Sequence, residues 1–98
     1  MVRVASDADL AEGGTLAVTV SGKEYALFRQ GGNIYCLDND CPHAGGPLAE
    51  GQVDSMAVSC PWHCWWFDIR TGDGLYGLGI GVACHACMIV DGEILIDV

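Results

Sequence analysis

Basic side chains are scarce in this 98-residue sequence, which has four Lys and Arg against thirteen Asp and Glu and a formal net charge of −9. Nucleic acids and anionic membrane surfaces attract cationic proteins, so the composition argues against both as partners. A protein with a basic docking face is a suitable partner, because opposite charges accelerate association in a salt-dependent way. Solubility alone explains the same charge, and composition does not separate the two interpretations.

Long apolar segments are also lacking. The longest apolar stretch, Leu78 to Val90, has thirteen residues and includes two glycines, so it is too short to cross a bilayer as a helix. The N-terminal residues reach an acid at Asp7, too early for a signal peptide. We therefore predict a cytoplasmic protein with no membrane association. In that reducing compartment, four of the six cysteines are expected to be free thiols: Cys36, Cys64, Cys84 and Cys87.

Helical patterns are nearly absent, since only Asp7 to Glu12 hints at a single helical turn. Short β-type runs instead recur between turn signals such as Ser21-Gly22, Gly31-Gly32-Asn33 and Asp91-Gly92. The predicted strands are Val2 to Ala5, Thr15 to Val20, Tyr25 to Arg29, Ile34 to Leu37, Met56 to Ser59, Val82 to Val90 and Ile94 to Val98. We predict an all-β fold, a small antiparallel β sandwich or barrel forming one domain over 1–98. No glycine motif opens a helix after a strand, so a flavin or NAD site is unsupported.

Two short cysteine-histidine pairs, C-P-H at 41–43 and C-P-W-H at 60–63, are the main chemical signal in the sequence. Together they supply two thiolates, from Cys41 and Cys60, and two imidazoles, from His43 and His63. A proline after each cysteine fixes φ and stiffens the turn that directs both side chains to one point. This ligand set suits an iron-sulfur centre or a structural zinc ion. The interval between the pairs contains Gly-Gly-Pro-Leu and a strand pattern instead of a finger helix, which disfavours zinc.

The segments C-P-H-A-G-G-P-L-A-E-G at 41–51 and C-P-W-H-C-W-W-F-D-I-R-T-G at 60–72 resemble the two cluster-binding loops of Rieske [2Fe–2S] proteins. The closing D-G-E-I-L-I-D-V at 91–98 is similar to the terminal hairpin of Rieske ferredoxins. The resemblance implies a Rieske-type [2Fe–2S] cluster in which Cys41 and Cys60 bind one iron while His43 and His63 bind the other. It also implies a cluster-binding lobe over about 39–70, inserted at one end of the β domain.

The mixed ligand set has a consequence for the reduction potential. With two thiolates and two neutral imidazoles, the oxidised centre carries no net charge, so it accepts an electron more easily than a four-thiolate centre. Its potential window is about −150 to +300 mV instead of about −400 mV. In high-potential Rieske proteins a disulfide ties the loops and two hydroxyls point at sulfur. The corresponding positions here lack these groups, and we expect a potential at the low end: Gly46 and Trp62 for the disulfide, Trp65 for the serine and Phe67 for the tyrosine.

Histidine is scarce as well, with only His43, His63 and His85 in the chain. A catalytic oxygenase subunit needs a mononuclear iron on two histidines and a carboxylate. After the cluster takes two histidines, a single one is left. The sequence therefore favours an electron carrier that performs no substrate chemistry itself.

The resemblance implies a soluble, monomeric ferredoxin that forms transient complexes. It would pass single electrons from an NAD(P)H-dependent flavin reductase to a terminal oxygenase, an aromatic-ring dioxygenase of aromatic hydrocarbon catabolism. The alternative is a small Rieske-like structural or regulatory subunit of a larger oxidoreductase such as assimilatory nitrite reductase.

Three further features are open to two interpretations each. Cys84-His85-Ala86-Cys87 looks like a second metal motif, but residues three apart on a strand point to opposite faces, so we expect core packing for both cysteines and for Cys36. Cys64 follows His63 where the ferredoxins usually have glycine, and either packs beside the cluster or occupies a strained position. The aromatic run at 62–67 is interpreted as packing, except that Trp66 is a candidate docking anchor.

Overall fold

The computed structural model describes residues 1–41, 46–62, 65–75 and 80–98. Within these ranges the regular structure consists of ten β-strands and two short 3-10 turns, and every strand pairing is antiparallel. The all-β prediction is therefore confirmed. The described part of the chain contains no helix that is long and apolar enough to span a membrane.

A four-stranded sheet forms the middle of the molecule, with the order β2-β3-β4-β8. Its strands are β2 (Thr15–Val20), β3 (Lys23–Gln30), β4 (Asn33–Asp38) and β8 (Cys84–His85). Tight turns join the first three strands. In the first turn Ser21 and Gly22 have φ of 51° and 80°, the left-handed values that a two-residue hairpin turn requires. Gly31 and Gly32 make the second turn in the same way.

The second sheet has the order β1-β10-β9 and joins the first and last strands of the fold. It contains β1 (Val2–Ser6), β10 (Glu93–Ile96) and β9 (Cys87–Val90), and the 3-10 turn η1 (Asp7–Asp9) follows β1. The single strand expected over 82–90 is wrong, because β8 pairs with β4 whereas β9 pairs with β10. The chain changes sheets at Ala86, whose carbonyl accepts a hydrogen bond from the Asp97 N–H at 2.9 Å.

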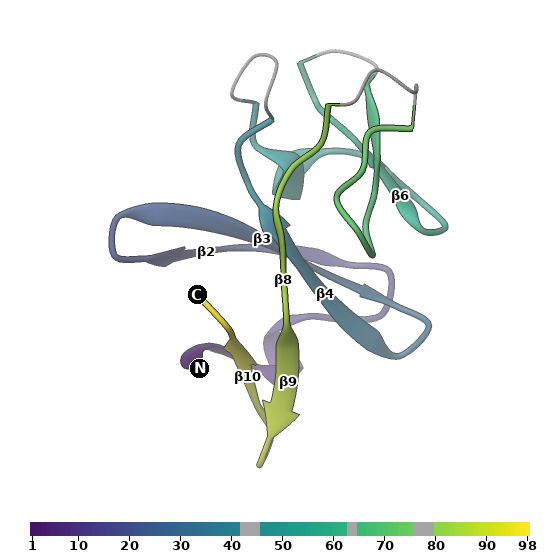
Figure 1. Ribbon diagram of the computed structural model, residues 1–98. Coiled ribbons are helices and arrows are strands. Elements are labelled where there is room, and N and C mark those ends of the chain that lie inside the picture. Colours follow the sequence, from purple (N-terminus) through teal and green to yellow (C-terminus); the bar gives the residue numbers. More distant parts are fainter. Residues whose placement is uncertain (42–45, 63–64, 76–79) are drawn as a thin grey trace.

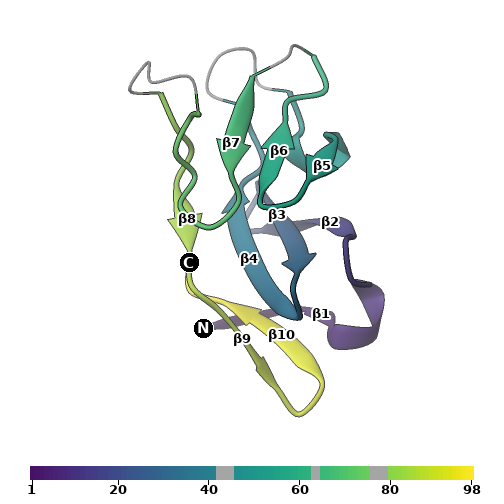
Figure 2. The ribbon, with the colours of Figure 1, turned by 90° about the vertical axis from the view of Figure 1, so that its right-hand side faces the viewer.

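The third sheet is small, has the order β5-β6-β7 and carries the second cysteine-histidine segment. Its strands are β5 (Val53–Asp54), β6 (Ala57–Ser59) and β7 (Trp66–Asp68), and the 3-10 turn η2 (Leu48–Glu50) precedes them. Figures 1 and 2 show this sheet at the opposite end of the molecule from the β9-β10 hairpin.

Strand β3 separates two hydrophobic cores. Alternate residues of a strand point to opposite faces, and Tyr25 and Leu27 enter one core while Ala26 and Phe28 enter the other. All four side chains are buried, which explains the uninterrupted apolar run Y-A-L-F. The first core lies among β1, β2 and β10. The second packs under the small sheet and contains Cys41 and Cys60.

Candidate metal centre

Two loops of equal length carry the four predicted ligands, and both loops are closed in the same way. Cys41 donates its N–H to the Gly46 carbonyl at 2.9 Å, and Cys60 donates its N–H to the Trp65 carbonyl at 2.9 Å. Just outside these bonds, Asp40 bridges to Pro47 and Ser59 pairs with Trp66. Each loop is therefore a six-residue hairpin loop that begins with a cysteine.

The structure brings the two predicted cysteine ligands into one buried setting. Cys41 and Cys60 are each 2% exposed and belong to the same hydrophobic cluster, together with Leu48, Val58 and Phe67. The end of the first loop approaches the second, because a Cβ built on Gly46 would lie 2.7 Å from the Cys60 Sγ. Both loops thus meet at the same end of the fold.

The two predicted histidine ligands, His43 and His63, lie outside the described residues, as does Cys64. Among the residues that the structure describes, no group of three or more His, Cys, Asp or Glu could hold a metal ion. Only two of the four predicted ligands, Cys41 and Cys60, are among these described residues. The full ligand set Cys41, His43, Cys60 and His63 therefore stays a prediction.

The donor set and its surroundings fit a [2Fe–2S] cluster of the mixed cysteine-histidine kind. A buried thiolate is costly unless a metal or another positive group compensates its charge, and two adjacent loops each present one buried cysteine. The glycine at position 46 lets the first loop pass close to the Cys60 sulfur, which a side chain would obstruct.

Asn39 supports the first loop and was not singled out from the sequence. Its side chain is 2% exposed, and Oδ1 accepts a hydrogen bond from the Ala49 N–H at 2.8 Å. Its carbonyl accepts another from the Leu48 N–H at 2.8 Å. Asn39 thus connects the segment just before Cys41 to η2, the 3-10 turn that follows the first loop. The signal in the sequence that could have identified this role was an Asn two residues before the first cysteine.

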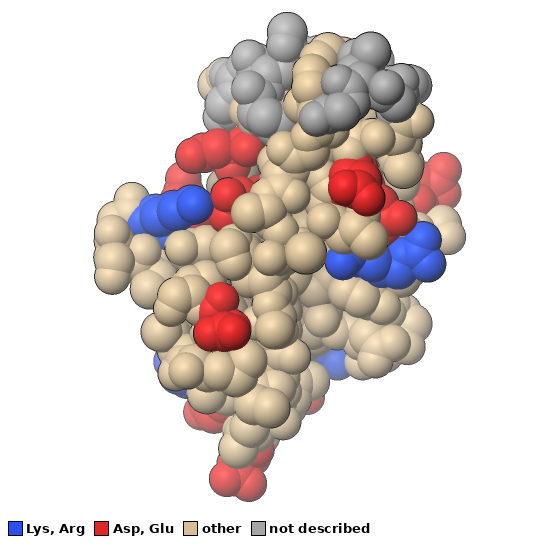
Figure 3. All heavy atoms as spheres, in the orientation of Figure 1, with Lys and Arg blue, Asp and Glu red and all other residues tan. Residues whose placement is uncertain are grey.

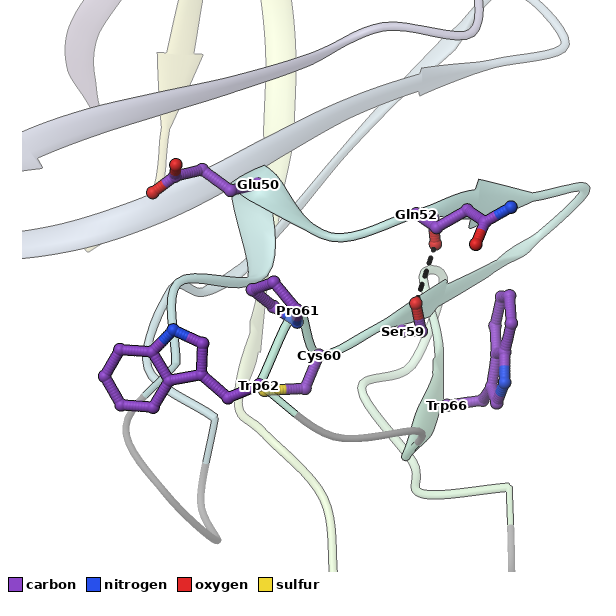
Figure 4. Close-up of a pocket in the computed structure, with 7 residues that line it drawn as sticks. All are labelled: Glu50, Gln52, Ser59, Cys60, Pro61, Trp62 and Trp66. Carbon is purple, nitrogen blue, oxygen red and sulfur yellow. Dashed lines mark hydrogen bonds between the residues drawn. The ribbon is translucent and has the colours of Figure 1, made fainter.

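The aromatic run at 62–67 does not simply pack inside the fold. Phe67 is fully buried, but Trp62 is 64% exposed, so the packing prediction is wrong for Trp62. Trp66 is half-buried, because its neighbour Phe67 points to the opposite face of β7. The two indoles belong to the lining of an open groove of about 540 Å³ (Figure 4). The full lining is Glu50, Gln52, Ser59, Cys60, Pro61, Trp62 and Trp66.

The second cysteine-rich motif is divided between two sheets. Cys84 is exposed on β8, so the expectation of core packing is wrong for it, whereas Cys36 is 1% exposed and packs in the core. Cys36, Cys84 and Cys87 form no disulfide. A hydrogen bond with the half-buried Cys87, reinforced by burial, raises the pKa of the Cys36 thiol, and the same bond lowers the pKa of Cys87. His85 instead contacts Asp38, with 2.8 Å between Nε2 and Oδ1.

All four basic side chains are engaged in ion pairs within the chain. The pairs are Arg3 with Glu93, Lys23 with Asp38, Arg29 with Asp7 and Arg70 with Asp68. The nine other carboxylates are all exposed, and none of them forms an ion pair within the described part of the chain: Asp9, Glu12, Glu24, Asp40, Glu50, Asp54, Asp73, Asp91 and Asp97. On the face of the molecule drawn in Figure 3, acidic side chains occur from the β9-β10 end to just below the loops. The net charge of −9 is thus carried at the surface by acids without an internal counter-ion.

Comparisons with known proteins agree with this architecture. Residues 1–77 match the family described as "Rieske [2Fe-2S] domain". The chain is 42% identical over 67 residues to the ferredoxin component of the naphthalene 1,2-dioxygenase system of Pseudomonas putida. That match covers 68% of this chain and 64% of the relative.

Solved structures extend the similarity to nearly the whole chain. The ferredoxin of carbazole 1,9a-dioxygenase from Nocardioides aromaticivorans IC177 is 32% identical with a TM-score of 0.89, covering 97% of this chain and 94% of that one. The Sphingomonas yanoikuyae B1 ferredoxin is 28% identical with a TM-score of 0.89, covering 98% of this chain and 96% of that one. The twin loops, the buried cysteines and these matches together show that the chain belongs to the Rieske [2Fe–2S] domain family, and resembles its ferredoxins in particular.

Proposed function

We propose that this protein is a one-electron carrier whose Rieske [2Fe–2S] cluster is bound by Cys41, His43, Cys60 and His63. The supporting observation is the pair of matched loops, each opened by a buried cysteine and both meeting at one end of the fold. Cys41 and Cys60 would hold one iron, and His43 and His63 the other. The bound cluster would supply reversible uptake of a single electron.

The chain's own residues would keep this site dry and rigid. Leu48, Val58 and Phe67 pack around the two cysteines and exclude water from the thiolate side. Asn39 and the two loop-closing hydrogen bonds hold both cysteines in place before the metal binds. Fixed ligand positions favour fast electron transfer, because little has to move when the charge changes.

The proposed partners are an NAD(P)H-dependent flavin reductase and a terminal oxygenase, an aromatic-ring dioxygenase. Relatives named as ferredoxin components of dioxygenase systems support this assignment. The unpaired surface carboxylates suit a carrier that must find a basic docking face quickly and leave it again. We further propose that residues 1–98 act as one cytoplasmic, monomeric domain without substrate chemistry of its own.

A structural or regulatory subunit of a nitrite reductase is the second candidate. A putative nitrite reductase small subunit from Mycobacterium tuberculosis has a TM-score of 0.88, but its sequence is only 21% identical to this chain. That degree of identity supports a shared fold only. No feature of the described residues favours this role over the carrier.

The deciding experiment is electron paramagnetic resonance of the purified protein after anaerobic reduction with dithionite. A mixed cysteine-histidine diiron centre gives a lower average g value than a four-cysteine centre, and we expect that signal here. Replacing His43 or His63 by Ala should abolish it. A silent sample with one tightly bound zinc ion, or with no metal, would contradict the carrier proposal.

A further inference from the structure

The groove beside Cys60 has an unusual lining for an exposed surface. Trp62 is 64% exposed, although the base of its indole ring lies against Gly46, where an added Cβ would be 3.1 Å from Cγ. In Figure 4, Trp62 and Trp66 stand at opposite ends of the group with Cys60 and Pro61 between them. One exposed and one half-buried indole ring thus flank a predicted cluster ligand.

Among the residues that line this groove, the one charged side chain is an acceptor, the Glu50 carboxylate. Glu50 contributes an exposed carboxylate on the Trp62 side, and Gln52 contributes an amide on the Trp66 side (Figure 4). The Ser59 hydroxyl donates to the backbone carbonyl of Gln52 at 3.5 Å, so the lone pairs of the Ser59 oxygen remain available as acceptors. No cation of this chain lines the groove, and all four are paired with carboxylates elsewhere.

An indole face next to a carboxylate is a binding environment for a guanidinium group. Cations bind best over the face of Trp, and arginine can stack on the ring while donating in a fork to a carboxylate. Lysine has a compact, strongly hydrated charge, which gives neither flat stacking on the ring nor a forked hydrogen bond to the carboxylate. A neutral or acidic occupant would leave Glu50 without compensation.

Building on the proposed carrier function, we propose that this groove binds an arginine side chain of the partner protein during electron transfer. The guanidinium lies against Trp62 and pairs with Glu50, and Trp66 closes the other end. Cys60 is part of the same lining, so the bound arginine fixes the partner next to a cluster ligand. Glu50 and Trp62 are positioning residues, since neither is placed in the metal site.

The test measures how fast the dithionite-reduced holoprotein is reoxidised by ferric horse-heart cytochrome c, a cationic electron acceptor. Stopped-flow traces are recorded at low salt with the native acceptor and with a guanidinated form whose lysines have become homoarginines. Glu50→Gln and Trp62→Leu remove the carboxylate and the indole face. Asp91→Asn and Met88→Leu are the matched controls, because both residues are exposed at the opposite end of the fold.

We expect the guanidinated acceptor to react at least twofold faster than the native one with the unmodified carrier. Glu50→Gln and Trp62→Leu should each lower the rate of reoxidation by the guanidinated acceptor at least fivefold. In both variants this acceptor should then react no faster than the native one. The controls should stay within twofold. Unchanged metal content and reduced-state spectra establish that each variant retains its cluster.

Two results overturn the inference while leaving the carrier function intact. One is an Asp91→Asn effect as large as that of Glu50→Gln, since the field of the whole surface would then explain both. The other is an undiminished rate in Trp62→Leu. If the unmodified protein holds no cluster or never reduces cytochrome c, the proposed function fails, and the inference fails with it.

Discussion

A Cβ added to Gly46 would lie 2.7 Å from the Sγ of Cys60, closer than real Cβ atoms approach other heavy atoms. The obstacle to a side chain here is therefore a lack of space beside the Cys60 sulfur and the Trp62 ring. Gly46, the last residue of the first loop, therefore lies directly against the cysteine sulfur of the second loop.

Gly46→Ala should impair cluster retention, because the added methyl group displaces either the loop or the Cys60 sulfur. We expect cluster retention to be about 10–100-fold weaker, the usual scale for disturbing the surroundings of a metal ligand. The measurement is iron per protein after gel filtration. Gly13→Ala is the control. At its φ of 77° a side chain costs about 1–2 kcal/mol in stability, but the added Cβ would meet nothing within 4 Å, so this variant should retain iron.

Two equally buried cysteines should respond differently to serine substitution. Cys41→Ser removes a predicted ligand and should abolish the cluster absorbance. Cys36→Ser buries a hydroxyl in the other core and should cost about 1–3 kcal/mol in stability while leaving the absorbance intact. Visible spectra and urea unfolding separate the two outcomes. Loss of the cluster from both variants under native conditions would argue against the ligand assignment.

Phe67→Tyr tests whether the potential is low because hydroxyl donors are missing. Phe67 is fully buried in the core that contains both cysteines, and a donor to sulfur stabilises the reduced state. One hydrogen bond worth about 0.5–1.5 kcal/mol corresponds to a rise of about 20–65 mV for one electron. Redox titration followed by circular dichroism measures this shift. Trp66→Tyr, on the opposite face of β7, should leave the potential unchanged.

Asp68 and Arg70 predict a pH-dependent stability. The Arg70 guanidinium, bonded to the Asp68 carboxylate at 3.1 Å, lowers the pKa of that carboxyl group below its usual value. Because the folded-state pKa is lowered, this stabilisation is present above the unfolded pKa of about 3.9 and is lost as pH falls through the folded pKa.

Asp68→Asn should therefore reduce the free energy of unfolding by about 1 kcal/mol at pH 7 and at pH 5. Below about pH 4 the difference from the unmodified protein should shrink. Urea unfolding at matched pH values measures it. Asp54→Asn, an exposed acid with no recorded ion pair, serves as the control. A difference that grows on acidification would contradict the assignment.

Local signals in the sequence predicted the hairpins well, and tertiary pairing explains the errors. Thr15–Val20 was predicted with its observed bounds, because Ser21-Gly22 supplies the turn chemistry without help from the rest of the fold. The segment 82–90 reads as one apolar strand, yet it is divided at Ala86 by pairing with two different sheets. Strands β5 and β7 were missed because two or three residues carry no periodicity of their own.

In the candidate site, too, local sequence signals gave correct predictions, and features formed only by tertiary structure were missed. Cys41 and Cys60 were predicted from motif spacing, and the structure buries both in one core. The groove was not predicted, since its lining combines η2, the second loop and two strands that meet only in the folded chain. Trp62 was misassigned to packing because an aromatic residue within an aromatic run gives no indication of which side chain faces solvent.

The exposed carboxylates that form no ion pair within the described part of the chain also affect how two copies of this protein meet. Each of the four cations is neutralised by a neighbouring acid, so any two copies approach with the same sign of charge. Like net charge keeps such proteins apart in solution. For the electron carrier proposed above, this repulsion would slow self-exchange between a reduced and an oxidised copy. An electron loaded onto one molecule would then be kept for the proposed basic acceptor instead of being passed among the carriers themselves.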